Sequence, residues 1–99
     1  MDAQMTRKIR LRAAELVDQG WCQGVTARDE KGHISWATSL AATSWCMFGA
    51  LKRAAFELLG SEEAVAVSDG LGSNPHWNDA PGRTADEVAA RLREMAERG

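Results

Sequence analysis

The sequence predicts a mainly α-helical fold: a small domain of three to four helices, with a long ordered loop or a weak β-hairpin between the first two. Three observations predict it. Residues 5–19 and the stretch after Thr84 both carry apolar residues at helical spacing. Between them, residues 40–59 form an apolar stretch long enough for a buried helix. Because 99 residues is a usual size for one domain, residues 1–99 are interpreted as a single domain.

The first predicted helix covers residues 5–19 and is amphipathic. Its apolar residues recur with a period of 3.6 and are Met5, Ile9, Ala13, Leu16 and Val17. Gly20 follows at the position of a glycine that ends a helix. Residues 21–36 are predicted to be irregular or to form a weak hairpin around the turn residues 29–32.

The central predicted helix covers residues 40–59, with either Ser39 or Ser44 as its N-cap. Gly49 is unfavourable inside a helix, so we expect another part of the chain, such as an indole ring, to approach it closely. Gly60 ends this helix. Residues 61–69 are then predicted to form a short helix, with a strand at residues 64–67 as the alternative, and residues 70–75 a loop.

The last predicted helix starts at a capping box, the pairing of Thr84 with Glu87 three residues later. Asp86 and Glu87 lie in its first turn and Arg98 near its end, which suits the helix dipole. The expected buried stripe consists of Val88, Leu92, Met95 and Ala96.

The composition argues against several classes of protein. A net charge of −2 argues against a general nucleic-acid binder, which usually has a basic surface. The one basic cluster, which could contact an acidic partner or simply face solvent, is Arg7, Lys8, Arg10 and Arg12. Residues 32–51 carry no formal charge, but their many hydroxyl groups argue against a membrane span. Two cysteines and no signal peptide predict a cytoplasmic protein without a disulfide framework.

Three short motifs hold both cysteines and three of the four tryptophans. They are Gly20-Trp21-Cys22-Gln23-Gly24, Trp45-Cys46-Met47-Phe48-Gly49-Ala50-Leu51, and Trp77-Asn78-Asp79 followed by Thr84-x-x-Glu87-Val88. Together they resemble a small family of uncharacterised bacterial and phage proteins, a domain of unknown function. The resemblance covers about residues 10–95, although residues 28–44 have no counterpart in it. It implies one intact domain and a bacterial or phage source, and it implies no activity, ligand or cofactor.

The enzymatic hypothesis is a thiol hydrolase or transferase that uses Cys46. If Ser44 is the N-cap, Cys46 lies in the first helical turn, where the dipole would lower the pKa of its thiol. His76 would then act as the base, and Asn78 or Asp79 would orient it. The alternative, which the sequence favours, is that Cys46 is a small buried hydrophobic residue.

The favoured hypothesis is a protein-interaction or regulatory domain that binds a protein partner or a second copy of itself. Tryptophan is enriched where interfaces gain most of their affinity, and the candidate binding residues are Trp21, Gln23, Trp36 and Trp77. No cofactor is predicted. A zinc site built from Cys22, His33, Cys46 and His76 is also not predicted, because these ligands do not occur in closely spaced pairs.

Overall fold

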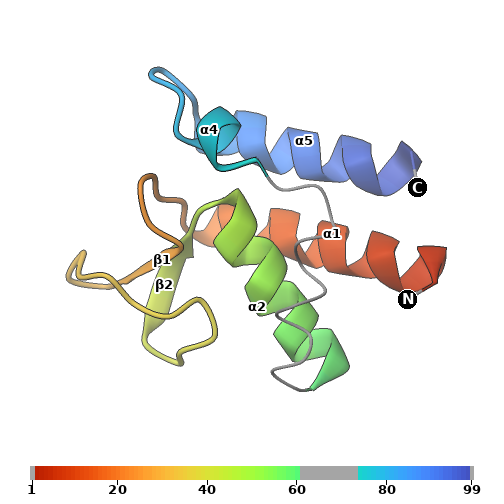
Figure 1. The fold of residues 1–99 in the computed structure, drawn as a ribbon, viewed down its shortest axis with the longest axis horizontal. Coiled ribbons are helices and arrows are strands. Elements are labelled where there is room, and N and C mark those ends of the chain that lie inside the picture. Colours follow the sequence, from red (N-terminus) through yellow and green to blue (C-terminus); the bar gives the residue numbers. More distant parts are fainter. Residues whose placement is uncertain (1, 61–73, 99) are drawn as a thin grey trace.

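The computed structural model describes residues 2–60 and 74–98. In chain order, its elements are α1 (Ala3–Gln19), β1 (Ala27–Asp29), β2 (Ala42–Trp45), α2 (Met47–Leu59), α4 (Pro75–Asn78) and α5 (Ala85–Arg98) (Figure 1). The mainly helical fold, with a small sheet and an ordered loop between the first two helices, is confirmed. The helix or strand predicted at residues 61–69, and nearly all of the loop predicted at 70–75, lie outside the described residues.

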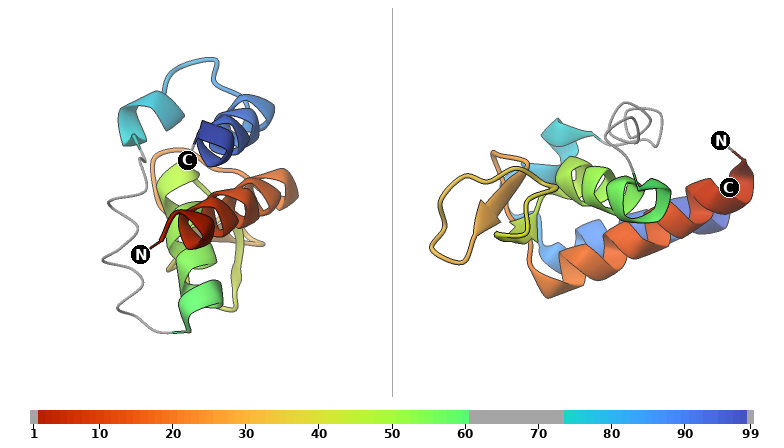
Figure 2. Two further views of the ribbon diagram at one scale, coloured as in Figure 1. Left: turned by 90° about the vertical axis from the view of Figure 1, so that its right-hand side faces the viewer. Right: turned by 90° about the horizontal axis from the view of Figure 1, so that it is seen from below.

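The first and last long helices lie side by side and antiparallel, and α2 crosses them at an angle (Figures 1 and 2). The core forms where these three helices meet. Its largest fully buried side chains are those of Ile9, Leu16, Met47, Leu51 and Leu92. Along α5 the predicted stripe is buried at Val88, Leu92 and Ala96, whereas Met95 is only half-buried and Ala89 is buried instead. No helix in the described ranges is long and apolar enough to cross a membrane.

The start of α5 and the end of α1 lie at the residues that the sequence predicts. At α5, the backbone N–H of Glu87 donates to Thr84 Oγ1 at 3.2 Å, and the backbone N–H of Thr84 donates to Glu87 Oε1 at 3.0 Å. The α1 helix ends at Gly20, whose N–H donates to the Leu16 carbonyl at 3.0 Å. However, the backbone of Gly20 is extended rather than left-handed. Glycine is needed there because a Cβ would lie 2.1 Å from the Thr43 carbonyl oxygen.

The predicted start of the central helix at residue 40 is wrong, because residues 42–45 form strand β2. This strand pairs antiparallel with β1, so that Ala27 lies opposite Trp45 and Arg28 opposite Ser44. An apolar run does not itself distinguish a buried strand from a buried helix.

The weak hairpin expected around residues 29–32 is present as one antiparallel bridge between Arg28 and Ile34. Two backbone hydrogen bonds flank this bridge, from the Asp29 N–H to the His33 carbonyl at 2.9 Å and from the Ser35 N–H to the Ala27 carbonyl at 3.0 Å. The longer pairing of β1 is with the later segment β2.

Helix α2 begins at Met47, and neither Ser39 nor Ser44 is its N-cap. The N-cap is Cys46, whose Sγ accepts a hydrogen bond from the Gly49 N–H at 3.3 Å. The close approach expected at Gly49 is present, but the neighbour is backbone rather than an indole. A Cβ on Gly49 would lie 1.9 Å from the Thr26 carbonyl oxygen. Gly60 ends α2 in the left-handed conformation, as expected.

Candidate functional site

The side-chain amide of Asn78, at the end of α4, joins the three sequence motifs. Asn78 is 1% exposed and is the one buried polar residue among those described. Its Oδ1 accepts from the Trp21 indole N–H at 2.8 Å and from the Met47 backbone N–H at 3.0 Å. Its Nδ2 donates to the Cys22 carbonyl at 3.3 Å and to Asp79 Oδ1 at 2.9 Å. The amide therefore makes all four of its hydrogen bonds within the protein.

Gln23 and Asp79 extend this network on its exposed side. Gln23 Nε2 donates to the carbonyls of Asn78 and Ala80, at 3.0 and 3.2 Å. Asp79 Oδ1 also accepts from the Gly24 N–H at 3.1 Å. We call this set of contacts the Asn78 junction; it comprises Trp21, Cys22, Gln23, Gly24, Met47, Asn78 and Asp79. It fastens the chain after α1 and the start of α2 to the α4 segment.

Cys46 lies at the edge of this junction, and the expected lowering of its thiol pKa is wrong. Burial raises the pKa of Cys46 above its ordinary value, and this effect outweighs the hydrogen bond from the Gly49 N–H, which lowers it. Cys46 is 7% exposed, and its sulfur caps α2. A buried, protonated thiol that accepts a backbone hydrogen bond is a poor nucleophile.

The other members of the proposed catalytic set do not surround Cys46 in the expected way. His76 is exposed, and no hydrogen bond in the described part of the chain joins it to Cys46. Asn78 and Asp79 bond to each other and to backbone groups, so they do not orient His76. The structure thus brings Cys46, Asn78 and Asp79 into one region without forming a Cys–His pair.

The four tryptophans have different environments. Trp45 is 4% exposed, and its indole N–H donates to the Ala37 carbonyl at 3.0 Å. Trp21 is half-buried in the Asn78 junction. Trp77 is half-buried too, with the Arg83 guanidinium 3.9 Å from the centre of its ring. Trp36 differs from these three, since 82% of its surface is exposed.

Trp36 lies in the connection between the strands, residues 30–41, which we call the β1–β2 loop. Two other large apolar residues of this loop, Ile34 and Leu40, are 72% and 96% exposed. The sequence indicates Trp36 as a binding residue but neither Ile34 nor Leu40, because Leu40 falls within the predicted central helix and Ile34 carries no motif. The absence of charge from residues 32–51 was the signal that could have indicated an apolar surface.

The β1–β2 loop is held from beneath by polar contacts. Arg53 on α2 donates to the Ala37 and Ser39 carbonyls at 3.2 and 2.7 Å, beside the indole of Trp45. At the start of the loop, Asp29 Oδ1 accepts from the backbone N–H groups of Lys31 and His33, both at 2.9 Å. Ala37 packs inward at 5% exposure. The loop therefore has a fixed shape while its large apolar side chains point to solvent.

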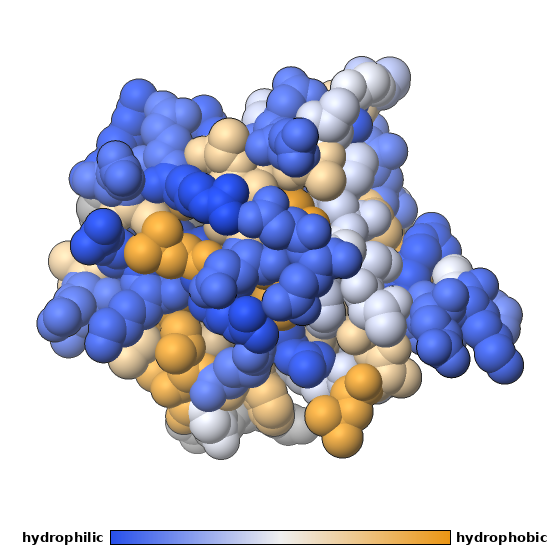
Figure 3. Space-filling model, turned by 180° about the vertical axis from the view of Figure 1, so that it is seen from behind, coloured by the Kyte–Doolittle hydropathy of each residue, from blue (hydrophilic) through white to orange (hydrophobic). Residues whose placement is uncertain are grey.

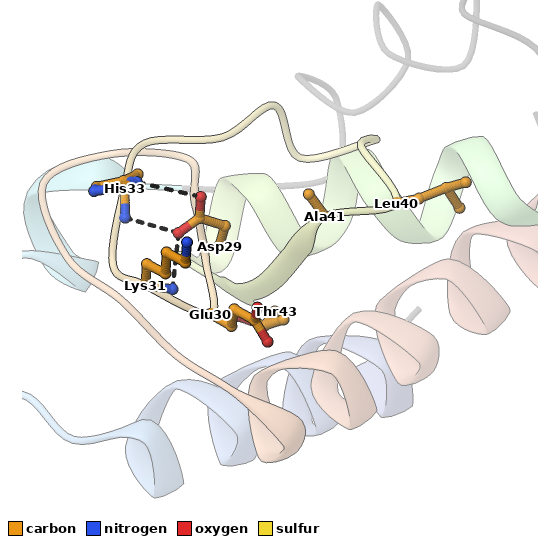
Figure 4. A pocket seen from close by; sticks show the side chains of 7 residues that line it. All are labelled: Asp29, Glu30, Lys31, His33, Leu40, Ala41 and Thr43. Carbon is orange, nitrogen blue, oxygen red and sulfur yellow. Dashed lines mark hydrogen bonds and ion pairs between the residues drawn. The ribbon is translucent and has the colours of Figure 1, made fainter.

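A hollow of about 460 Å³ lies between the two arms of this loop (Figure 4). Asp29 and His33 face each other on one arm, with Asp29 Oδ2 3.7 Å from His33 Nδ1. The remaining lining residues are Glu30, Lys31, Leu40, Ala41 and Thr43. Since four of these seven side chains are ionisable, the hollow suits polar groups rather than an apolar ligand.

The basic cluster on α1 is partly used inside the protein. Arg12 pairs with Glu57 at 3.0 Å, and Arg10 donates to the Met95 carbonyl at 3.3 Å.

The face of the molecule opposite to that in Figure 1 carries mainly hydrophilic side chains, with apolar ones scattered between them (Figure 3). Within residues 2–60 and 74–98, no group of three or more His, Cys, Asp or Glu side chains could hold a metal ion.

Comparisons with known proteins identify a family, but they assign no activity. Among curated proteins and among solved structures, none matches this chain. Residues 1–98 match a family of unknown function, DUF6197. With nearly the whole chain matched, this protein belongs to the DUF6197 family.

Proposed function

We propose that this chain is a protein-interaction domain and that the β1–β2 loop is its contact surface. One observation carries the proposal: Ile34, Trp36 and Leu40 expose 72%, 82% and 96% of their surfaces on a single loop. Exposed groups of large apolar side chains are unusual on soluble domains and are typical of interaction sites. Tryptophan in particular contributes strongly to binding when a partner covers it.

The contacts beneath the loop also support this function. Because Arg53, Trp45 and Asp29 hold its backbone, little conformational freedom would be lost when a partner binds. A loop of fixed shape with an indole at its surface suits insertion into an apolar recess. The neighbouring hollow of this chain is lined largely by ionisable groups, so we propose a different protein as the partner rather than a second copy.

The thiol-enzyme alternative has less support. Its nucleophile, Cys46, is buried, has a raised pKa and caps a helix. A cytoplasmic setting and a bacterial or phage source belong to the proposal as well, supported by the two free cysteines and by the motif resemblance.

The test compares a Trp36→Ser, Leu40→Ser double variant with a matched Leu58→Ser, Leu59→Ser variant. Leu58 and Leu59 are also exposed, at 41% and 39%, but lie at the end of α2. A protein captured from lysate of the source organism would be purified, and its affinity for each chain measured directly. We expect the loop variant to bind roughly 30-fold more weakly, while its unfolding free energy changes by less than about 0.5 kcal/mol.

Equal affinity of the wild-type chain and the loop variant would contradict the proposal. Sedimentation of the free protein tests self-association. A dimer that dissociates in the loop variant but not in the Leu58, Leu59 variant would replace the partner protein by a second copy.

A further inference from the structure

Cys22 and Cys46 each follow a tryptophan directly, and these two tryptophans, Trp21 and Trp45, are paired through backbone hydrogen bonds. The Trp45 N–H donates to the Gly20 carbonyl at 3.0 Å, and the Cys22 N–H donates to the Trp45 carbonyl at 3.3 Å. These two bonds form a parallel bridge between Trp21 and Trp45. In parallel pairing, the next residues along each chain are also neighbours, at the strand spacing of about 4.8 Å. Cys22 and Cys46 occupy these next positions.

The Asn78 amide keeps the two segments together beyond the bridge. A continued parallel ladder would pair the Met47 N–H with the Cys22 carbonyl. Instead, Met47 donates to Asn78 Oδ1 and the Cys22 carbonyl accepts from Asn78 Nδ2. The side-chain amide thus stands in for the missing bond and spans the two chains. The segments that carry Cys22 and Cys46 are therefore joined twice: by the bond from the Cys22 N–H to the Trp45 carbonyl, and by the Asn78 amide.

The two thiols also lie on the same side of the pairing. Side chains of β2 alternate between its faces, so Ser44 and Cys46, which follow each other by two, share one face. In parallel pairing, directly neighbouring residues direct their side chains to the same face of the pair, which places the Cys22 side chain on the face of Cys46. Both cysteines are free and buried, at 8% and 7% exposure.

We propose that Cys22 and Cys46 form an oxidative modification site that closes to an intramolecular disulfide by exchange with a small-molecule disulfide. Disulfides require Cα atoms about 4.4–6.8 Å apart and side chains directed toward each other. Neighbouring positions on one face of a parallel pair lie within this distance, and rotation about the two Cα–Cβ bonds directs the sulfurs toward each other. The site is independent of the proposed interaction surface, because none of its residues belongs to the β1–β2 loop.

The reaction takes two exchange steps. Either cysteine can react first; when Cys22 does, its thiolate attacks one sulfur of the small disulfide and displaces one thiolate. The Cys46 thiolate then attacks the Cys22 sulfur of the mixed disulfide and displaces the second thiolate. The two protons lost by the cysteines end on the two released thiols. The protein is oxidised by two electrons and the small disulfide is reduced.

The test equilibrates the full chain with glutathione and glutathione disulfide in native buffer and, separately, in urea. Mass spectrometry after alkylation then measures the Cys22–Cys46 disulfide by the loss of two hydrogen atoms. We expect the equilibrium constant for disulfide formation to be at least about tenfold larger in the native protein, because folding holds the thiols together. By thermodynamic linkage, the oxidised protein should unfold at higher urea than the reduced protein.

A decoy variant gives the matched control. Leu58 lies near the end of α2, about 18 Å along the helix from Cys46, so the double change Leu58→Cys, Cys46→Ser keeps two thiols but separates them. The decoy should form no more disulfide when native than when unfolded. Equal equilibrium constants for the native and unfolded wild-type chain, a lower urea midpoint after oxidation, or accumulation of only the mixed glutathione disulfide would each overturn the proposal.

Discussion

The Asn78 junction and the β1–β2 loop use similar residues in opposite ways. Each contains a tryptophan and at least one other apolar side chain within a few residues of a polar anchor. In the junction, Trp21 is half-buried and its indole N–H is bonded to Asn78. In the loop, the backbone is anchored by Arg53 while Trp36 is left 82% exposed. Fixed backbone geometry therefore stabilises the core at one place and presents an apolar surface at the other.

This difference teaches how to interpret distinctive motifs in a small domain. The residues that made the sequence recognisable, such as Trp21, Asn78 and Asp79, are occupied by contacts inside the protein. The residues available to a partner, Ile34, Trp36 and Leu40, lie in the β1–β2 loop and outside the three motifs. Three substitutions at motif residues test whether the motifs serve contacts inside the protein. They are given from the largest expected effect on stability to the smallest.

Replacing Asn78 by leucine should cause the largest loss of stability. The indole N–H of Trp21, the N–H of Met47 and the Cys22 carbonyl would all lose their partner in the protein interior. At roughly 1–3 kcal/mol for each buried unpaired group, we expect a loss of at least about 3 kcal/mol. Urea unfolding measures it. The control is Asn74→Ala, which removes the exposed N-cap of α4 and should cost about 1 kcal/mol. Equal losses in the two variants would show that the junction is not specially stabilising.

Gly49→Ala tests the contact between α2 and the chain before β1. In an ordinary helix interior this change would stabilise by about 1 kcal/mol. Here the new Cβ would meet the Thr26 carbonyl, which also accepts the Cys46 N–H at 3.1 Å. We expect a loss of about 3 kcal/mol from this overlap. Gly60→Ala, on the same helix but with open space around it, should cost only about 1–2 kcal/mol from its left-handed backbone. A stabilised Gly49→Ala variant would contradict the close approach.

A smaller, pH-dependent effect is expected at the capping box of α5. The hydrogen bonds from Thr84 are the main cause of the lowered pKa of Glu87, and the nearby Arg83 adds to them. Because the folded pKa lies below the ordinary value of 4.5, this contribution is complete above that pH and is lost as the pH falls through the folded pKa. Glu87→Gln should therefore be less stable than wild type at neutral pH, with the difference vanishing in acid. Thermal unfolding between about pH 7 and pH 2 measures it.

Glu94→Gln removes a charge from the same helix outside the capping box and is the control for general charge effects. The same pH dependence in both variants would assign the effect to net charge rather than to the cap.

Local signals in the sequence predicted the helices well and the sheet poorly. The capping box at Thr84 and the apolar period of residues 5–19 involve neighbours in sequence, so they predicted α5 and α1. The strand β2 could not be distinguished in this way, because its partner β1 is supplied by a segment some distance away. For the same reason Gly49 indicated a close contact without identifying Thr26.

Like the fold, the candidate site was predicted only in part from the sequence. The motifs suggested one packed unit, and Trp36 was selected as a binding residue, which stays a prediction. What the sequence could not supply was the side of the protein on which each residue lies. The favoured interpretation of Cys46 as a small buried residue is confirmed. The alternative, a thiol in the first helical turn with a lowered pKa, is wrong, because the strand before it places the thiol at the cap and buries it.

The hydrogen bonds of Asn78 have a consequence for how this chain folds. They join residues 31, 56 and 57 positions apart in sequence. Such contacts form only after a long stretch of chain has closed on itself, and that closure has an entropic cost before any bond compensates it. Helices α1 and α2 can form from local contacts. The chain after α1 and the start of α2, however, acquire the Asn78 side chain as their partner only when the last quarter of the sequence packs against them. A fragment that ends at Gly60 would therefore lack both the α5 surface and the amide that completes α2, so folding requires both halves of the chain.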